Sequence, residues 1–176
     1  MPASPTSGPA SQTLPGASET RTASVRVSAK ADYALRALAE LAAAADDGPV
    51  KGDRIATAQG ISLRFLENIL VELKHARLVQ SQRGPDGGYS LARAPETITL
   101  ADIIRAVDGP LAGVRGEPPE AVEYTGPAAG LRDVWVAVRA SMRSVLEAVT
   151  LADLASGRLP ESVVELGRAP DAWSRR

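Results

Sequence analysis

Cysteine is absent from this 176-residue sequence, and histidine occurs only once. The lack of cysteine excludes disulfide scaffolds, thiol catalysis and every cysteine-ligated zinc or iron–sulfur site. With only one histidine as well, we expect neither a metal nor another cofactor. No nucleophilic side chain stands beside a candidate base, so the chain is not expected to be an enzyme.

Aromatic residues are also scarce, at 3% of the composition, although apolar residues make up 44%. The core must therefore be built from alanine, leucine, valine and isoleucine, which favours packed helices over a β-sandwich. Lysine and arginine number 20 against 21 acidic residues. A nucleic-acid partner would therefore have to be bound by a local basic patch.

Long hydrophobic runs are missing as well, since no stretch approaches the roughly 20 apolar residues that span a bilayer. Residues 1–24 are rich in proline, serine, threonine and alanine, a composition typical of a disordered tail. This segment lacks the basic start and the apolar run of a secretory signal. We therefore expect a soluble, cytoplasmic, nucleoid-associated protein with no membrane partner.

Three helices are predicted between residues 25 and 77. Ser28 is suited to cap the first helix, in which alanine and leucine recur at helical spacing. Gly60 supplies the turn between a short second helix and a third helix that Ser62 caps. The third helix carries an apolar stripe that we expect to face the core: Phe65, Leu66, Ile69, Leu70 and Leu73.

Helix, short helix, turn, helix and β-hairpin, in this order, are typical of a winged helix-turn-helix domain. Strands at residues 78–82 and 89–92 flank a turn in which Gly87 and Gly88 are expected to allow positive φ and close backbone approach. Residues 54–93 contain six lysines and arginines against three acidic residues, a net charge of +3 in a chain of −1. The basic charge is thus concentrated where DNA phosphates would lie.

The second helix of a helix-turn-helix unit enters the major groove with its N-terminal residues at the base edges. The candidate base-contacting residues are Ser62, Arg64, Glu67 and Asn68. Arginine can bind guanine through two hydrogen bonds, and glutamate can accept one from the cytosine amino group. Arg83, in the hairpin, is predicted to enter the minor groove. The alternative for Arg64 and Glu67 is a surface salt bridge at i,i+3 spacing.

Beyond the hairpin, the tetrapeptide Thr-Leu-Ala-Asp begins at Thr99 and again at Thr150, each time as the capping-box pattern of a helix. Residues 110–130 form a glycine- and proline-rich loop, residues 131–157 a long and a short helix, and residues 158–176 a loosely packed tail. The long helix carries an apolar seam, at spacings of four and three residues, that fits lengthwise packing on another helix, either within the chain or across a two-fold axis. The seam consists of Leu131, Trp135, Val138, Met142, Val145 and Val149.

Four segments carry a resemblance to a known family: Ser28–Leu38, Gln59–Leu70, Leu78–Tyr89 and Ile103–Gly109. The third contains the wing sequence Arg-Gly-Pro-Asp-Gly-Gly-Tyr. Together they resemble the bacterial winged-helix regulators that include IscR, NsrR and CymR, over about residues 27–157. The resemblance implies a homodimeric transcription factor, usually a repressor, whose dimer is held by the long helix after the winged domain. The apolar seam from Leu131 to Val149 falls on this helix and is therefore expected to form the dimer interface.

The resemblance also implies which residues touch DNA. By position, the family's recognition helix corresponds to residues 62–68, where Ser62, Arg64 and Glu67 match, and the wing arginine corresponds to Arg83. Lys30 and Tyr33 match a first-helix motif that is expected to touch backbone phosphates.

One departure from the family pattern concerns the loop of residues 110–130. Several relatives bind an iron–sulfur cluster through three cysteines there, whereas this loop offers only Glu117, Glu120, Glu123 and Tyr124. A cluster of that kind cannot form in this chain. The signal is therefore expected to be an unknown small-molecule or protein effector, and the loop either senses it or merely connects two helices.

The sequence thus predicts a mainly α fold with a small β-hairpin wing, of class α+β. Residues 25–109 form the winged helix-turn-helix domain, and the long C-terminal helix dimerises it. The expected function is sequence-specific binding of double-stranded DNA, with repression at a pseudo-palindromic operator and no iron–sulfur cluster. The alternative is a protein-interaction module that keeps the winged fold without binding DNA, and salt dependence distinguishes the two.

Overall fold

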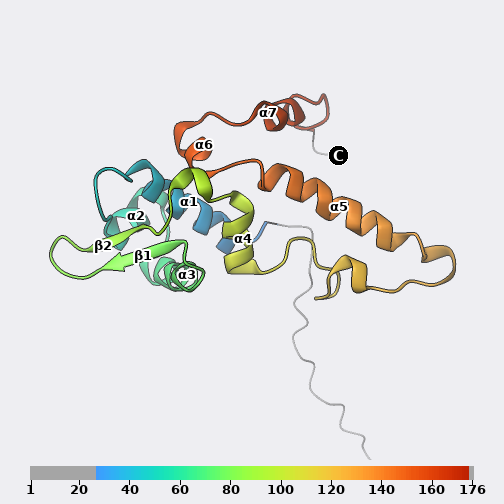
Figure 1. Cartoon of the computed structure of the whole chain (residues 1–176), viewed down its shortest axis with the longest axis horizontal. Coiled ribbons are helices and arrows are strands. Elements are labelled where there is room, and N and C mark those ends of the chain that lie inside the picture. Colours follow the sequence, from blue (N-terminus) through green and yellow to red (C-terminus); the bar gives the residue numbers. More distant parts are fainter. Residues whose placement is uncertain (1–26, 175–176) are drawn as a thin grey trace, which may run out of the picture.

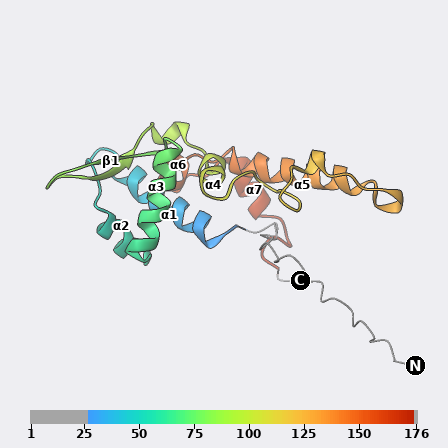
Figure 2. The same ribbon diagram turned by 90° about the horizontal axis from the view of Figure 1, so that it is seen from below.

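The computed structural model describes residues 27–174, and the predicted disordered tail of residues 1–24 lies outside this range. A winged helix-turn-helix domain occupies one end of the molecule, and a long helix projects from it toward the other (Figures 1 and 2). No helix among the described residues is both long enough and apolar enough to cross a membrane. The helices and strands, in chain order, are α1 (Ala29–Ala43), α2 (Gly52–Gln59), α3 (Leu63–His75), β1 (Val79–Gln82), β2 (Gly88–Leu91), η1 (Pro95–Thr97), α4 (Leu100–Asp108), η2 (Pro119–Ala121), η3 (Gly126–Ala128), α5 (Leu131–Leu146), α6 (Leu151–Ser156) and α7 (Glu161–Gly167).

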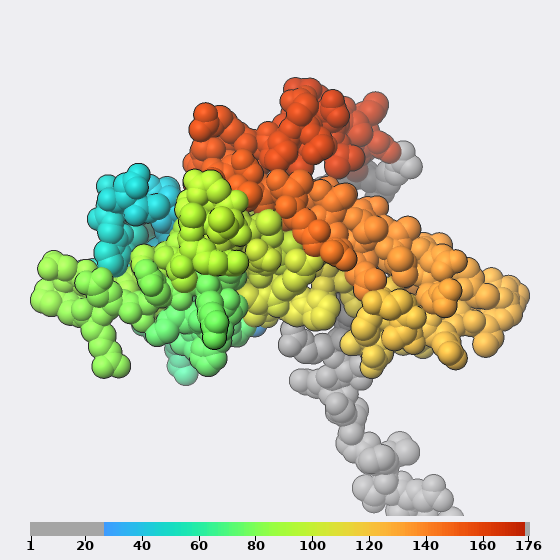
Figure 3. Space-filling model, viewed as in Figure 1, coloured from blue at the N-terminus to red at the C-terminus, as the bar shows by residue number. Residues whose placement is uncertain are grey.

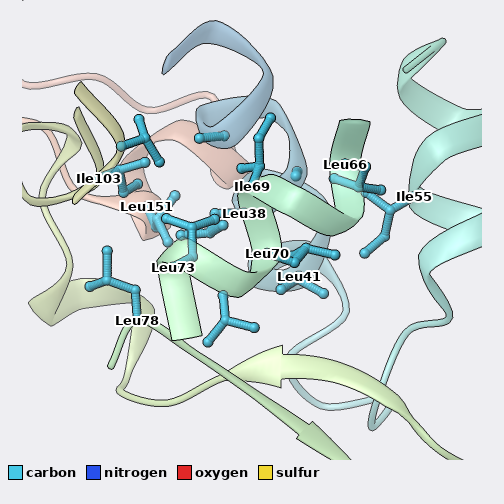
Figure 4. Close-up of a cluster of buried hydrophobic side chains, with 14 of the residues drawn as sticks. Leu38, Leu41, Ile55, Leu66, Ile69, Leu70, Leu73, Leu78, Ile103 and Leu151 are labelled. Carbon is cyan, nitrogen blue, oxygen red and sulfur yellow. The ribbon is translucent and has the colours of Figure 1, made fainter. Parts of the chain in front are cut away.

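Helix α1 lies at the centre of the domain and packs against α2, α3, α4 and α6. It begins where predicted, since the Ser28 Oγ accepts a hydrogen bond of 2.9 Å from the Ala31 N–H. Its buried face consists of alanines and leucines, which allow the neighbouring helices to approach closely. The core around it is aliphatic, as the scarcity of aromatic residues requires; its labelled members in Figure 4 are Leu38, Leu41, Ile55, Leu66, Ile69, Leu70, Leu73, Leu78, Ile103 and Leu151.

The wing is a two-stranded antiparallel hairpin in which Val79 pairs with Leu91 and Gln82 with Gly88. A further segment from before α2 joins its edge, because Val50 and Tyr89 exchange two backbone hydrogen bonds of 2.8 Å each. These bonds tie the wing to the helix-turn-helix unit. The wing is therefore held at a defined position beside α3 (Figure 1).

The repeated tetrapeptide begins α4 and α6, and both copies form complete capping boxes, at Thr99 with Asp102 and at Thr150 with Asp153. The two copies also contact each other through an antiparallel bridge between Thr99 and Thr150. The Leu100 N–H donates to the Val149 carbonyl at 3.0 Å on one side of this bridge. The two copies of the tetrapeptide thus join the starts of two helices that are 51 positions apart in the sequence.

Helix α5 is the longest helix, with 16 residues, and extends for about 24 Å. It packs against η2 and α4, and the loop of residues 110–130 lies along it in Figure 3, yellow beside orange. None of its residues is buried. A helix with an apolar seam and no buried residue is incompletely covered within one copy of the chain.

The segment predicted as a loosely packed tail, residues 158–176, contains the short helix α7. Sequence analysis did not predict this helix, because Gly167 and the flanking prolines Pro160 and Pro170 suggest irregular structure. No residue of α7 is buried. The packing is therefore loose even though the backbone is helical.

Candidate nucleic-acid interface

Helix α3 separates cleanly into a core face and an exposed face. Leu66, Ile69, Leu70 and Leu73 are buried. On the opposite side an exposed stripe follows helical spacing and runs along the whole helix: Arg64, Asn68, Val71 and His75. Of these, Val71 is 54% exposed and is an apolar member of the stripe that sequence analysis did not single out.

The polar side chains at the start of α3 have no partners among residues 27–174. Arg64, Glu67 and Asn68 are exposed, and none of them makes a hydrogen bond or an ion pair there. The surface salt bridge considered for Arg64 and Glu67 is therefore not formed. Their hydrogen-bonding groups remain available to a ligand.

Ser62 precedes α3 as predicted, but its hydroxyl does not cap the helix. The prediction of a side-chain cap at this position is wrong. The Ser62 carbonyl accepts the Leu66 N–H instead, and the hydroxyl is exposed. A free hydroxyl beside the first backbone N–H groups of a helix suits contact with a phosphate oxygen.

Phe65 does not belong to the buried face of α3, contrary to the predicted stripe, and is 39% exposed. Successive residues turn by about 100° around a helix axis, so Phe65 lies roughly a quarter-turn from the centre of the core face. Its ring packs edge-on against the ring of Tyr33, with centroids 5.7 Å apart. This aromatic contact holds the start of α3 against α1.

The two first-helix residues differ in their availability to DNA. The Lys30 Nζ donates to the Val107 carbonyl at 2.6 Å and forms an ion pair of 2.7 Å with Glu72. Two of its three donors are thus used within the chain, and Lys30 positions α1 against α3 and α4. The Tyr33 hydroxyl has no partner among the described residues.

The wing lies beside α3 and is linked to it by a hydrogen bond of 2.8 Å from the Lys74 Nζ to the Ser81 Oγ. Arg83 is exposed and has no partner within the part of the chain that the structure describes. Exposed cationic and polar groups of α3 and of the wing are thus held in one fixed arrangement.

The glycines of the wing act differently from the prediction. Neither Gly87 nor Gly88 has positive φ, which is found at Gly84 instead (φ +112°). Close backbone approach is present, but it occurs within the chain. A Cβ atom on Gly87 would lie 2.4 Å from the Gln82 carbonyl oxygen. A Cβ atom on Gly88 would lie 2.5 Å from the Val50 carbonyl oxygen. Both glycines are needed to build the wing.

A polar network that sequence analysis missed fixes the angle between α1 and α2. The Arg36 Nε donates to the Gln59 Oε1 at 3.0 Å, and the same guanidinium donates to the Gln59 carbonyl. The Gln59 amide in turn donates to Glu40. Polar pairs of this kind have no periodic signal, so only the folded structure brings them together.

The apolar seam of α5 is only partly as predicted. Leu131 is 39% exposed, and Trp135, Val138, Met142 and Val145 are half-buried. Val149, by contrast, lies beyond the end of α5 and is 2% exposed within the single chain. Its prediction as a dimer contact is therefore wrong, because the bridge between Thr99 and Thr150 draws it into the core.

A family model described as "Rrf2: Iron-dependent Transcriptional regulator" matches residues 27–157. A Mycobacterium tuberculosis protein named as an HTH-type transcriptional regulator is 54% identical over 142 residues, covering 81% of this chain and 88% of that protein. The HTH-type transcriptional regulator CymR of Bacillus subtilis is 38% identical, covering 75% of this chain and 91% of CymR. These names describe transcriptional regulators and not enzymes.

The iron in the family description has no suitable ligands here. The chain has no cysteine, and no group of three or more histidine, aspartate, glutamate or cysteine residues within residues 27–174 could hold a metal ion. The described residues therefore do not fit an iron centre, and a chain without cysteine cannot form a cysteine-ligated iron–sulfur cluster.

Several solved structures are similar to this one, among them those of a CymR and an IscR. The B. subtilis CymR structure superposes with a TM-score of 0.65, covering 75% of this chain and 97% of that one. An IscR structure from T. potens, 35% identical, superposes with a TM-score of 0.63 and covers 78% of this chain and 90% of that one. Together with the exposed groups on α3 and the wing, these matches identify the chain as a member of the Rrf2 family of winged-helix, DNA-binding transcriptional regulators.

Proposed function

We propose that the protein is a homodimeric repressor that binds a pseudo-palindromic operator. Each copy inserts α3 into the major groove and lays the wing along the neighbouring minor groove. Two-fold symmetry places the two α3 helices about 34 Å apart, or a multiple of that distance, along the DNA. The observation that carries this proposal is the set of exposed polar groups at the start of α3 and in the wing that have no partner within residues 27–174.

Each group on α3 has a chemistry that suits a base. We assign Arg64 to a guanine, Glu67 to a cytosine amino group and Asn68 to an adenine. Val71, further along the same exposed stripe, suits a thymine methyl group. These four residues would carry the sequence preference.

A second set of residues serves affinity more than sequence preference. The free hydroxyls of Ser62 and Tyr33 suit phosphate oxygens, and Arg83 suits the minor groove, where the negative potential is deepest when the groove is narrow. Gly87 and Gly88 contribute through the shape of the wing, since their own backbone atoms are in close contact with Gln82 and Val50. Lys30 contributes by positioning α1.

Dimerisation through α5 is supported by the apolar seam without Val149: Leu131, Trp135, Val138, Met142 and Val145. These side chains are not buried within one copy. A second α5 packed along the seam would bury them, as in other helix pairs with this spacing.

The test is DNA binding by the full chain on an operator identified by genomic footprinting. The Arg64→Ala variant is expected to lose about 1–3 kcal/mol of discrimination at a single base position. The Arg83→Ala variant is expected to bind the operator more weakly and with a smaller salt dependence, because it loses a cation placed in the minor groove. Arg132→Ala is the matched control, since Arg132 is an exposed arginine of α5. Unchanged binding by both test variants would contradict the assignment.

The alternative, a protein-interaction module, predicts no DNA affinity even at low salt. Repression through DNA predicts binding that weakens steeply between low and moderate salt, because phosphate contacts release counterions. A titration of the wild-type chain at several salt concentrations therefore separates the two functions.

A further inference from the structure

An open cavity of about 490 Å³ lies where α4, the following loop and α5 meet. This volume is within the range of small-molecule sites. In Figure 1 the region lies between the winged domain and the projecting helix. Its lining comes from these three segments: Arg105, Gly109, Pro110, Leu111, Glu120, Arg139 and Arg143.

The charged side chains of the lining are mostly cationic. Three guanidinium groups, those of Arg105, Arg139 and Arg143, face one carboxylate, that of Glu120. The backbone atoms of Gly109 and Pro110 and the side chain of Leu111 form the remainder. In a chain of net charge −1, such a concentration of arginine away from α3 and the wing is not explained by DNA binding.

The arginines already bind acidic groups of the chain itself. Arg139 forms an ion pair of 2.6 Å with Glu120 of η2, and Arg143 forms one of 2.9 Å with Glu147. Arg105 of α4 binds the same Glu147 carboxylate. Hydrogen bonds from its own backbone and from Arg139 lower the pKa of Glu120, which is therefore charged at neutral pH. The Asp102 carboxylate also lies 3.9 Å from the Arg105 guanidinium. Glu120 and Glu147 thus occupy positions that external acidic groups could take.

The cavity and the apolar seam use different faces of α5. At about 100° per residue, Arg139 and Arg143 lie roughly a quarter-turn around the helix from the centre of the seam. Arg139 is only 23% exposed, because η2 packs over it. Dimerisation along the seam therefore leaves the arginine face directed toward α4 and η2.

We propose that this cavity is an effector site for a small organic anion that carries at least two acidic groups, either carboxylates or phosphates. Guanidinium groups bind both kinds of group through paired hydrogen bonds. One acidic group of the ligand would replace Glu120 on Arg139, and a second would replace Glu147 on Arg105 and Arg143. Leu111 and Pro110 would contact the carbon skeleton.

Binding at this place would reach the DNA-binding surface through α4, a step that rests on the proposed function. Arg105 belongs to the winged domain, whereas Arg139 and Arg143 belong to the helix that we assign to dimerisation. Release of Glu120 would also free η2 from α5. An anion that draws these segments together changes the angle between the winged domain and α5, and with it the separation of the two α3 helices.

The experiment is calorimetric titration of the full chain, without DNA and at constant ionic strength, with citrate and separately with pyrophosphate. We expect saturable binding of at least one of them, and the comparison separates carboxylate from phosphate ligands. Combined Arg139→Ala and Arg143→Ala substitution is expected to weaken binding by at least about tenfold. The matched control, Arg132→Ala, removes an arginine from the same helix outside the cavity and should leave binding unchanged.

The Glu120→Gln variant is expected to change the anion affinity in the opposite direction from the arginine variants. It removes the internal competitor for Arg139, so binding should become roughly threefold tighter. Because the Glu120 side chain is 57% exposed, this variant should fold even if the arginine variants do not.

The proposal is overturned if neither anion binds the wild-type chain saturably at millimolar concentration. It is also overturned if the double arginine variant binds with unchanged affinity, or if Glu120→Gln fails to tighten binding. DNA binding is measured separately on the same preparations. A chain that binds its operator but neither anion contradicts only the effector site, and one that binds an anion but no DNA contradicts only the proposed function.

Discussion

Two glycines of the wing, which sequence analysis assigned to DNA binding, are also required for the wing to fold. Gly87 and Gly88 suggest a thin wing that approaches DNA, yet their nearest neighbours are carbonyl groups of the same chain. The space beside Gly88 is filled by the backbone of Val50 and Lys51, which cannot move as a flexible side chain could. Glycine is therefore required there whether or not DNA is bound.

Substitution of Gly88 by alanine is expected to destabilise the protein by about 1–3 kcal/mol, because the new Cβ atom would overlap backbone atoms. Urea denaturation followed by circular dichroism measures the change. The control is Gly167→Ala, since nothing lies within 4 Å of a Cβ atom built on Gly167. Equal loss of stability in the two variants would show that the contact between Gly88 and Val50 is not tight.

At the scale of elements, the helix starts of α4 and α6 combine two kinds of stabilisation. Each capping box satisfies its own first backbone donors, and the bridge between Thr99 and Thr150 joins the two boxes. Hydrogen bonds from the backbone and then the side chain of Thr150 lower the pKa of Asp153 below its ordinary value of 3.8. The charged form of Asp153 is therefore the one that the folded state favours.

The pH dependence follows from the direction of this shift. A carboxyl group whose pKa is lower in the folded state stabilises the fold above its unfolded pKa, and this contribution is lost as pH falls through the folded-state pKa. Asp153→Asn should thus lower the melting temperature at neutral pH, and the difference from wild type should shrink below pH 3.8. Thermal unfolding over a pH series checks this.

Asp46→Asn is the control for that series, because Asp46 is exposed and makes no side-chain hydrogen bond or ion pair within residues 27–174. It should leave the melting temperature nearly unchanged throughout. A difference between Asp153→Asn and wild type that stays constant into strong acid would show that the carboxylate charge plays no part.

At the scale of the whole molecule, α5 has two faces with separate roles. One face carries Arg139 and Arg143 and packs against η2 and α4. The other carries the apolar seam, which one copy of the chain does not bury. A single copy is therefore incomplete, and the second copy that we propose would cover the seam.

Met142→Asp places a charge in the middle of this seam. An unpaired charge in an interface costs about 3 kcal/mol or more, so the dimer dissociation constant should rise by at least about a hundredfold. Analytical ultracentrifugation measures it. Ala140→Asp is the matched control, because Ala140 is exposed and lies on the opposite side of α5 from the seam. A dimer that is equally stable in both variants would place the interface elsewhere.

Much of the fold was predictable from sequence because its signals are local. Ser28, Gly60 and the two Thr-Leu-Ala-Asp boxes mark the ends of helices, and the order of elements indicates a winged domain. The positions of Arg64, Glu67 and Asn68 in the candidate site were also predictable, because helical period separates them from the buried face of α3, and Arg83 was predictable from its place in the turn of the hairpin. Their contacts with DNA stay predictions.

Other properties depend on contacts between distant segments, which local patterns do not contain. Lys30 is a surface cation by sequence, but its ion pair with Glu72, forty-two positions away, makes it a positioning residue. The network of Arg36, Gln59 and Glu40 has no periodic signal for the same reason. The arginine cavity likewise exists only because α4, η2 and α5 meet.

The sequence by itself determined the absence of thiolate ligands, the helix-turn-helix order and the polar outer face of α3, since these follow from composition, period and capping. Tertiary structure alone decided which apolar residues are covered and by what. Val149 continues the spacing of the seam but is buried by its own chain, whereas Met142, in the same pattern, is not. Periodicity identifies an apolar face, but the partner that covers it is set by the path of the chain in space.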